Sequence, residues 1–325
     1  MADGRLKVVI TDLGYASYEP EREELAPTGA ELVLAQCADE AQVAAECADA
    51  DAVITRMAPV GARAIAAMRK CRVISRYGVG VDYVDVAAAT ARGIPVAHVR
   101  DYCNEEVSDQ ALALLLACVR RISSRDRQVR AGRWDIGARE PVYRIAGKVL
   151  GLVGYGAIAR TLHRKMAGFE PAEVLVHDAF IPADRIEKAG ARAVPLQELL
   201  ARSDFVSLHV PLTEATRHLI DRDALGTMKP TAILVNTSRG GVVDTDALYE
   251  ALKAGRIAAA GLDVHEQEPP PPDYKLFDLD NVVLTDHAGW YSEEAQEALQ
   301  RTTARNVALV LAGGKPLYCV NPEVL

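Results

Sequence analysis

The stretch Val149-Leu150-Gly151-Leu152-Val153-Gly154-Tyr155-Gly156-Ala157-Ile158-Ala159 decides the fold of this chain. Its first five residues predict a short buried strand, and the residues after Gly156 predict a helix that runs to about Gly168. Between the two, Gly154 permits a tight turn, Gly156 leaves the backbone open to a ligand, and Ala159 lets helix and strand pack closely. Glycine-rich turns also recur for purely structural reasons, so the surrounding sequence must decide between the two interpretations.

Strands and helices alternate along the chain on both sides of this stretch. Short β-branched runs separated by Ala-rich helical patterns occupy residues 7–10, 30–34, 52–55, 73–75 and 95–98, and then 149–153, 174–176, 205–208, 232–235, 258–261 and 282–284. Such alternation predicts parallel sheets that are covered by helices on both faces. The two sets of strands predict two sheets, and therefore an α/β fold with two doubly wound domains.

Two long helical patterns mark where the chain passes between the expected domains. The first follows Asn104, a good helix-capping residue, and buries the apolar run Ala111–Val119. The last begins near Ser292 and ends at Gly313. If this last helix packs on the N-terminal domain, residues 1–101 and 288–325 form one domain, and residues 102–287 form a second domain inserted into it. A chain of 325 residues is long enough for two cores.

Composition and charge exclude several classes of protein. The net charge of −8 disfavours a nucleic-acid-binding surface, which needs a basic face. The six cysteines have neither paired nor metal-ligand spacing, which predicts reduced thiols and no metal site. The longest apolar run, Ala111–Val119, is far too short to span a membrane, and the N-terminus has no signal-peptide pattern. We therefore expect a cytoplasmic protein without nucleic-acid or membrane partners.

The strand after the glycine-rich turn ends in an acidic residue. Asp178 lies about 20 residues beyond Gly156, which is the spacing of the carboxylate that accepts the ribose 2′-hydroxyl of a bound dinucleotide. The alternative is an ordinary helix-capping aspartate. A carboxylate here repels a 2′-phosphate, and neither Ala179 nor Phe180 offers that phosphate a cation, so NAD is favoured over NADP. We predict a Rossmann domain that binds NAD through Gly154, Tyr155, Gly156, Ala157, Ile158 and Asp178.

Three ionisable residues follow three later strands of the second set. Arg239 follows residues 232–235, Glu268 follows 258–261, and His287 follows 282–284. Ligands of open α/β sheets bind at the carboxyl ends of the strands, so these side chains are expected to converge. Reduction of a 2-keto acid needs a proton donor, for which His287 is suited near neutral pH when Glu268 holds its other ring nitrogen. Arg239 can grip the substrate carboxylate and polarise the carbonyl with its planar fork.

Each of the three residues also has a structural interpretation. Arg239 can be part of a surface ion pair, Glu268 a loop charge, and His287 a hydrogen-bonded core histidine. Their position after three strands favours the functional interpretation for the set. His209 is a weaker candidate for lining the cofactor pocket and is more simply explained as structural. We expect an oxidoreductase that moves a hydride between NAD(H) and C2 of a small 2-hydroxy or 2-keto acid.

These motifs together resemble the D-isomer-specific 2-hydroxyacid dehydrogenase family over essentially the whole chain. The stretch Ser75–Asp82 is similar to the substrate loop of that family. The resemblance implies that the substrate carboxylate is held by backbone N–H groups of Tyr77, Gly78, Val79 and Gly80. It also implies a flavodoxin-like substrate domain around the NAD domain, and a homodimer formed through the NAD domains.

The same resemblance implies roles for the residues that follow the later strands. Arg239, Glu268 and His287 are the implied catalytic residues, and Asp263 is implied to hold the nicotinamide amide. The residues implied to contact the cofactor here are Thr237, Ser238, Arg239, Asp263 and His287.

Within the family, Trp290 resembles the branch of the C-terminal-binding proteins, in which a Trp follows the catalytic histidine by three residues. That branch includes NAD(H)-sensing transcriptional corepressors. A scaffold whose dimerisation reports nicotinamide levels is therefore the alternative function, although the complete set of catalytic groups favours an enzyme.

Three positions depart from the usual pattern of the family. Asp286 stands where a proline commonly precedes the histidine and adds a second carboxylate beside it, and Tyr83 replaces a frequent asparagine. Arg100 stands where a proline is usual, which leads to the hypothesis that it binds a second anionic group such as a carboxylate, phosphate or phosphonate. The alternative for Arg100 is an exposed hinge arginine. The residues expected to shape the substrate pocket are Met57, Arg100, Tyr102 and Trp290, together with Arg239 and His287.

Overall fold

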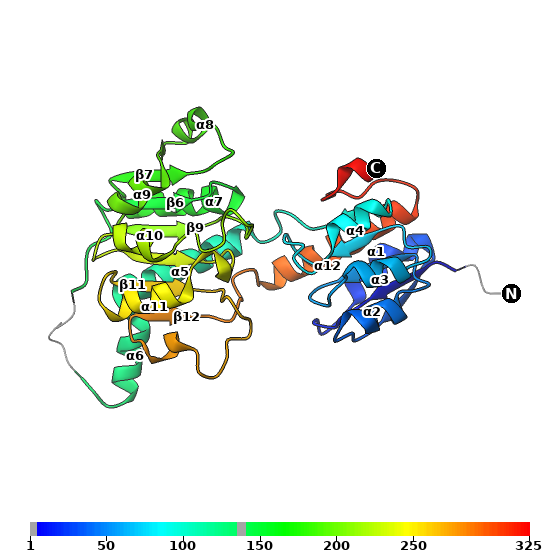
Figure 1. The fold of residues 1–325 in the computed structure, drawn as a ribbon, viewed down its shortest axis with the longest axis horizontal. Coiled ribbons are helices and arrows are strands. Elements are labelled where there is room, and N and C mark those ends of the chain that lie inside the picture. The colour runs from blue at the N-terminus through cyan, green and yellow to red at the C-terminus, as the bar shows by residue number, and fades with distance from the viewer. Residues whose placement is uncertain (1–4, 135–140) are drawn as a thin grey trace. The chain divides into compact units, whose positions relative to one another are not determined.

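The computed structural model describes residues 5–134 and 141–325. The chain divides into two compact units, of which the first contains Met1–Tyr102 with Ser292–Leu325 and the second contains Cys103–Tyr291 (Figure 1). The sequence places the two crossings slightly earlier, at 101/102 and 287/288. Ala288 and Gly289 stay with the second unit because their backbone N–H groups donate to the carboxylate of Asp263.

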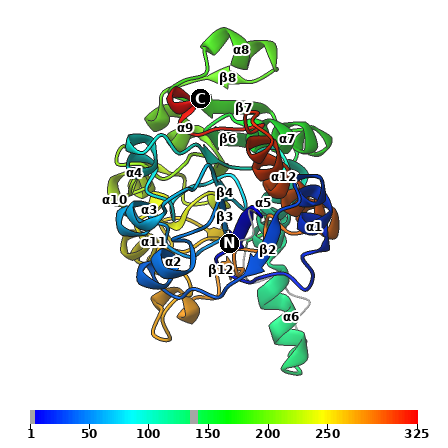
Figure 2. The ribbon, with the colours of Figure 1, turned by 90° about the vertical axis from the view of Figure 1, so that its right-hand side faces the viewer.

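The first unit is built on a five-stranded parallel sheet with the order β2-β1-β3-β4-β5. Its strands are β1 (Lys7–Ile10), β2 (Glu31–Leu34), β3 (Ala52–Thr55), β4 (Ile74–Arg76) and β5 (Val96–Ala97). Its helices are α1 (Glu19–Leu25), α2 (Glu40–Glu46), α3 (Ala62–Ala67), α4 (Val86–Ala91) and α12 (Glu293–Leu311). Figure 2 shows α2, α3 and α4 on one side of the sheet and α1 and α12 on the other.

The C-terminal helix completes the first unit. As the sequence predicts, α12 begins after Ser292, whose hydroxyl accepts a hydrogen bond from the Ala295 N–H at 2.9 Å. The helix packs on α1, β3 and β4, and the Ser75 hydroxyl donates to the carbonyl of Thr303 at 3.0 Å. The last segment of the chain is therefore part of the same core as the first strands.

The second unit contains a seven-stranded parallel sheet with the order β12-β11-β10-β9-β6-β7-β8. Its strands are β6 (Val149–Val153), β7 (Glu173–His177), β8 (Arg192–Ala193), β9 (Phe205–Leu208), β10 (Ile233–Asn236), β11 (Ala259–Leu262) and β12 (Val282–Leu284). Its helices are α5 (Asn104–Arg120), α6 (Ile122–Arg130), α7 (Ala157–Met166), α8 (Ala183–Lys188), α9 (Leu196–Arg202), α10 (Arg222–Thr227) and α11 (Thr245–Lys253). The two-residue edge strand β8 was not predicted, because so short a strand has no hydrophobic period to detect.

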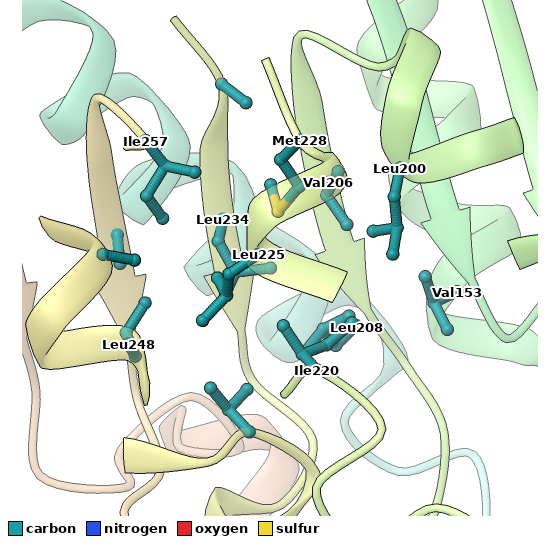
Figure 3. Close-up of a cluster of buried hydrophobic side chains, with 14 of the residues drawn as sticks. Val153, Leu200, Val206, Leu208, Ile220, Leu225, Met228, Leu234, Leu248 and Ile257 are labelled. Atoms are coloured by element: carbon teal, nitrogen blue, oxygen red, sulfur yellow. The ribbon is translucent and has the colours of Figure 1, made fainter. Parts of the chain in front are cut away.

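Both faces of this sheet are covered by apolar side chains. On one face the core includes Leu234 of β10 together with residues of α9, α10 and α11 (Figure 3). The neighbours of Leu234 on the same strand, Ile233 and Val235, belong to the other core, against α5 and α7. Alternate residues of one strand therefore enter opposite cores, which explains why the central strands are mostly apolar.

The predicted capping role of Asn104 is wrong. Asn104 is the first residue of α5, and the cap position belongs to Cys103, which makes no side-chain capping bond. The first turn is instead tied to the neighbouring helix, because Glu105 on α5 pairs with Lys165 of α7 at 2.9 Å. Among the described residues, no helix combines the length and apolar character needed to cross a membrane.

Candidate active site

The predicted site residues of the second unit all follow the carboxyl ends of its strands. Gly154–Ile158 follow β6, Asp178 follows β7, His209 follows β9, Thr237–Arg239 follow β10, Asp263 and Glu268 follow β11, and His287 follows β12. Because the sheet is parallel, these segments all lie at the same end of it, where its strands finish. The fold therefore gathers the predicted groups at the place where α/β sheets bind ligands.

The glycine-rich turn excludes a side chain at its first glycine. Gly154 has φ +86, and a Cβ there would lie 2.8 Å from the carbonyl oxygen of His209. Its N–H donates to the carbonyl of His177 at 2.8 Å. Both the backbone conformation and the close approach of the β9 loop thus require glycine at this position.

The second glycine of the turn faces open space. A Cβ on Gly156 would meet no heavy atom within 4 Å, and Gly156 is the N-cap of α7 without a side-chain capping bond. The first turn of α7 carries no acidic residue, and Arg160 lies one turn further along the helix. The open backbone at the positive end of a helix is suited to an anionic group such as a pyrophosphate.

Tyr155 helps to build the turn. Its backbone N–H donates to the Asp178 carboxylate at 2.7 Å, and its buried phenol lies 2.7 Å from the ring nitrogen Nδ1 of His163. Tyr155 therefore holds the turn against β7, and its contact with the cofactor stays a prediction.

Asp178 accepts three backbone hydrogen bonds. Besides Tyr155, the N–H groups of Phe180 and Ile181 donate to its other oxygen, each at 2.8 Å. Although partial burial opposes ionisation, these three donors hold the pKa of Asp178 below its ordinary value. Phe180 is 93% exposed, and the residues that directly follow Asp178 carry no cation. The carboxylate is thus a fixed negative charge at the end of β7.

The turn after β10 leaves one buried polar atom without a partner. The buried Asn236 side chain accepts from the N–H and hydroxyl of Ser238, at 3.0 and 2.8 Å, and donates to the Arg239 carbonyl at 2.9 Å. Within the described residues, the buried Thr237 Oγ1 has no hydrogen-bond partner. An open helix N-terminus after β6 and an orphaned hydroxyl after β10 both fit a long cofactor with several polar groups.

His287 and Glu268 are in direct contact. Nδ1 of His287 lies 2.6 Å from Oε2 of Glu268, whose other oxygen accepts the His265 N–H at 2.9 Å. Burial alone would raise the pKa of Glu268, but the bonds from His287 and from the His265 backbone lower it below its ordinary value. The His287 side chain remains 42% exposed, so its second ring nitrogen can reach a ligand.

Asp263 positions the turn that carries His287. The residue is only 2% exposed, and its carboxylate accepts from Gln110, Thr285, Ala288 and Gly289 at 2.6 to 3.2 Å. Its own carbonyl accepts the His287 N–H at 2.8 Å. Contact of Asp263 with the nicotinamide amide stays a prediction, whereas its support of the His287 turn is visible in the structure.

Arg239 lies on a loop that touches the loop of Glu268. A Cβ on Gly240 would lie 1.9 Å from the carbonyl carbon of His265, so the two loops meet backbone to backbone. His218 joins both loops, because its N–H donates to the Gly241 carbonyl at 2.8 Å and its ring contacts the Glu266 carboxylate. The structure therefore brings the loops of Arg239, Glu268 and His287 together.

Two further predicted residues occupy different settings. The His209 ring lies 2.9 Å from the Ser207 hydroxyl, and burial lowers the pKa of His209 to about 4, so the ring is neutral near pH 7. Trp290 is half-buried and packs edge-on against Tyr291, with ring centroids 5.6 Å apart.

The substrate-loop residues lie in the first unit, after β4. Tyr77 presents neither its backbone nor its side chain, because its N–H donates to the Thr55 carbonyl at 2.9 Å and its phenol to the buried Glu21 at 2.6 Å. This corrects the expectation that the Tyr77 N–H binds substrate. Gly78 has φ +120, and the neighbouring Val79 is 46% exposed. Arg100 and Met57 are exposed, and Tyr102 is half-buried.

Several supporting residues were not predicted. Gln110 and His218 reach the site from other segments, and no sequence spacing indicates those contacts. His265 lies on the Glu268 loop itself, where its backbone N–H donates to Glu268. Asn236 could have been found, because a polar amide at the end of an apolar strand and before Thr237 and Ser238 is typical of a turn-forming residue. Among the described residues, no group of three or more His, Cys, Asp or Glu side chains is arranged to hold a metal ion.

Comparison with known proteins identifies the family of this chain. Residues 112–289 match the family model described as D-isomer specific 2-hydroxyacid dehydrogenase, NAD binding domain. A glyoxylate reductase of Korarchaeum cryptofilum is 45% identical over 282 residues, which cover 85% of this chain and 84% of that protein. A D-3-phosphoglycerate dehydrogenase of Methanocaldococcus jannaschii is 41% identical over 267 residues, covering 82% of this chain but 50% of that protein.

Solved structures show the same architecture. The D-lactate dehydrogenase of Aquifex aeolicus, complexed with NAD and lactic acid, has a TM-score of 0.87 and 27% identity, covering 97% of this chain and 99% of that one. The sequence relatives, the family model and the solved structure thus agree on the family and the fold. The chain belongs to the D-isomer-specific 2-hydroxyacid dehydrogenase family and is an NAD-dependent oxidoreductase that acts on a CH–OH group.

Proposed function

We propose that this enzyme reduces a small 2-keto acid, or oxidises the corresponding 2-hydroxy acid, with His287 as the general acid and base. The observation that carries the proposal is the 2.6 Å contact between His287 Nδ1 and Glu268 Oε2, on loops that abut the loop of Arg239. A histidine oriented by a carboxylate, beside an arginine, is what proton transfer to a carbonyl oxygen needs.

NAD, when bound, supplies or accepts the hydride at C2. The N–H groups of Gly156, Ala157 and Ile158 at the start of α7 are suited to its pyrophosphate, and Asp178 to its adenosine ribose. Thr237, Ser238 and Asp263 are assigned to its nicotinamide end, where Thr237 Oγ1 would gain the partner that it lacks among the described residues. The fixed negative charge of Asp178 disfavours a 2′-phosphate, which favours NAD over NADP.

His287 moves the proton through Nε2. Because Nδ1 is held by Glu268, Nε2 is the nitrogen that remains for the substrate oxygen. In reduction, the Nε2–H bond breaks and the proton passes to the carbonyl oxygen as C2 gains its hydrogen; in oxidation, Nε2 accepts the hydroxyl proton. Glu268 stabilises the protonated ring and does not itself exchange a proton with the substrate.

Arg239 binds and polarises the substrate. Its guanidinium is a planar fork that matches a carboxylate, and it also stabilises the charge that develops on the carbonyl oxygen. In the first unit, we assign the backbone N–H groups of Gly78, Val79 and Gly80 to the substrate carboxylate. Arg100 and Trp290 are assigned to the remainder of the substrate.

The substrate is a small 2-keto acid of the kind that the names of the relatives indicate. One of those names contains glyoxylate, which has a single anionic group, and another contains 3-phosphoglycerate, which also carries a phosphate. Oxidation of NADH, followed by its absorbance in the presence of a panel of 2-keto acids, tests the proposal. Steady turnover of at least one acid is expected. Inactivity across the panel, combined with association of subunits on nucleotide binding, would instead favour the NAD(H)-sensing scaffold.

We also propose that the enzyme is a homodimer formed through its second units. The helix α6 (Ile122–Arg130) buries none of its residues, and Ile122, Val129 and Trp134 are all more than half exposed. A largely apolar cavity of about 450 Å³ lies next to the end of α5, lined in part by Cys118, Phe205 and Ile233. Light scattering after gel filtration is expected to give twice the chain mass, and the variant Val129→Glu is expected to give more monomer. A monomeric wild-type protein would contradict this part of the proposal.

A further inference from the structure

Three neighbouring strands of the first unit are followed by arginines at their carboxyl ends. Arg56 directly follows β3, Arg76 is the last residue of β4, and Arg100 comes shortly after β5. The three strands are adjacent and parallel, so the three arginines lie at the same end of the sheet, beyond the carboxyl ends of the strands. Neighbouring strands lie about 4.8 Å apart, so Arg56 and Arg76 begin close to each other, whereas Arg100 begins three residues beyond the end of β5.

Arg56 is held in place without an ion pair. The backbone N–H groups of Arg56 and Met57 donate to the buried Asp12 carboxylate, at 2.9 and 2.6 Å. The Arg56 guanidinium lies 5.8 Å from the centre of the Tyr15 ring, and Nη1 occupies the space beside Gly14, where a Cβ would be only 2.2 Å away. In residues 5–134 and 141–325, no carboxylate lies within ion-pair distance of this half-buried cation. Its positive charge is therefore not neutralised by a carboxylate of the described residues, and the guanidinium is only partly covered.

Arg100 is also unneutralised within the described part of the chain. It is exposed and makes no hydrogen bond or ion pair with any described residue. Of the acids near this end of the sheet, Asp12 and Glu21 are buried and hydrogen-bonded to other groups, whereas Asp82 and Asp101 are exposed. Two arginines at this end therefore keep their positive charge available to an anion.

Arg76 lies between the other two arginines in the order of the strands. Its Nη1 lies 1.9 Å from where a Cβ of Gly78 would be, which places the guanidinium against the proposed carboxylate loop. Burial raises the pKa of Tyr15, and both Arg56 and Arg76 oppose that rise. Burial lowers the pKa of His98, and both Arg100 and Arg76 lower it further. Arg76 thus acts on one titratable neighbour together with Arg56 and on another together with Arg100.

We propose that Arg56 and Arg100 bind a second anionic group of the substrate, so that the enzyme prefers 2-keto acids with two anionic groups. This inference rests on the proposed function and narrows its substrate class. The loop Gly78–Gly80 takes the C1 carboxylate, and the arginines on either side of it take a carboxylate, phosphate or phosphonate at the far end of the molecule. The guanidinium fork is the side chain best matched to any of these three groups.

The test compares substrates that differ in charge but little in size. The wild-type enzyme is assayed with NADH and two matched pairs, 2-oxobutanoate against oxaloacetate and 2-oxopentanoate against 2-oxoglutarate, with phosphonopyruvate as the phosphonate probe. At least one dianionic acid is expected to have a kcat/KM about tenfold or more above that of the monoanions, which corresponds to one charge-assisted hydrogen bond.

The variants Arg56→Met and Arg100→Met keep an unbranched apolar side chain and remove the guanidinium with its charge. Each is expected to lower the dianion-to-monoanion ratio of kcat/KM by about tenfold, mainly through KM for the dianion. The matched control is Arg72→Met, which replaces an exposed arginine that precedes β4 at the opposite end of the sheet and is expected to leave the ratio unchanged. Thermal unfolding of all three variants checks that they fold.

The possible failures can be distinguished. Turnover of monoanions without any preference for dianions would overturn the inference and leave the proposed function intact. A preference that survives in both variants would also overturn it. Absence of turnover with every acid would contradict the proposed function itself.

Discussion

The two sheets differ in how charged side chains are held at the carboxyl ends of their strands. In the second unit, three acidic groups that follow strands accept bonds from nearby donors: Asp178 from three backbone N–H groups, Asp263 from four donors, and Glu268 from His287 and the His265 backbone. In the first unit, Arg56 and Arg100 have no ion pair with any described residue. The chemistry common to all substrates needs fixed geometry, whereas recognition of a particular substrate needs charge that the protein itself leaves unbalanced.

The largest effect is expected where the second unit loses its proton donor. In the variant His287→Asn, kcat should fall by about 10²- to 10⁴-fold, because the proton must then come from water. Binding of NADH, followed by its fluorescence, should persist, since the glycine-rich turn is untouched. A variant that kept more than a tenth of the wild-type kcat would show that His287 is not the general acid.

A smaller effect is expected when the loops at the same end of this sheet are pushed apart. Gly240→Ala would place a Cβ 1.9 Å from the His265 carbonyl carbon, so the Arg239 and Glu268 loops must separate, and kcat/KM should fall by about 100-fold. The matched control is Gly226→Ala in α10, where a Cβ meets nothing within 4 Å. Equal activities of the two variants would mean that the spacing of these loops does not matter.

Loss of the contact between His218 and Glu266 should lower activity less than the Gly240→Ala substitution does. Residue 218 has a left-handed backbone, which asparagine tolerates, so the variant His218→Asn is suitable. This variant and Glu266→Gln should each lower kcat about fivefold, which is equivalent to roughly 1 kcal/mol. If the contact positions the Glu268 loop, the double variant should be little worse than either single one. Effects that simply multiply would show that the two residues act independently.

The smallest effect concerns pH and stability. The pKa of Glu268 is lower in the folded protein than its ordinary value of 4.5, so its ionised form stabilises the folded state above that pH, and this contribution is lost as pH falls through the folded pKa. In urea unfolding from pH 7 to pH 3, the stability difference between wild type and Glu268→Gln should therefore shrink below about pH 4.5. A difference that stayed constant over this range would contradict the proposed coupling.

Most of the fold followed from local patterns in the sequence. The strand predictions 7–10, 52–55, 149–153, 205–208 and 282–284 match β1, β3, β6, β9 and β12 at both ends, because each is a short, mostly apolar run and most have a polar residue or glycine on either side. The cap of α5 and the edge strand β8 were not found, since neither depends on a repeating pattern. The His287–Glu268 contact was expected from the order of the strands, and the structure shows it.

By itself, the sequence determined the alternation of strands and helices and the placement of reactive residues after particular strands. Both can be predicted because hydrophobic periodicity and glycine-rich turns depend on only a few neighbouring residues. Only the tertiary structure decided that Asp263 holds the His287 turn, that Tyr77 turns inward to Glu21, and that Arg56 carries no ion pair with the described residues. Those facts depend on which donors and acceptors meet across segments that lie far apart in the chain. Hydrogen bonding and burial settle them only when the sheets have formed.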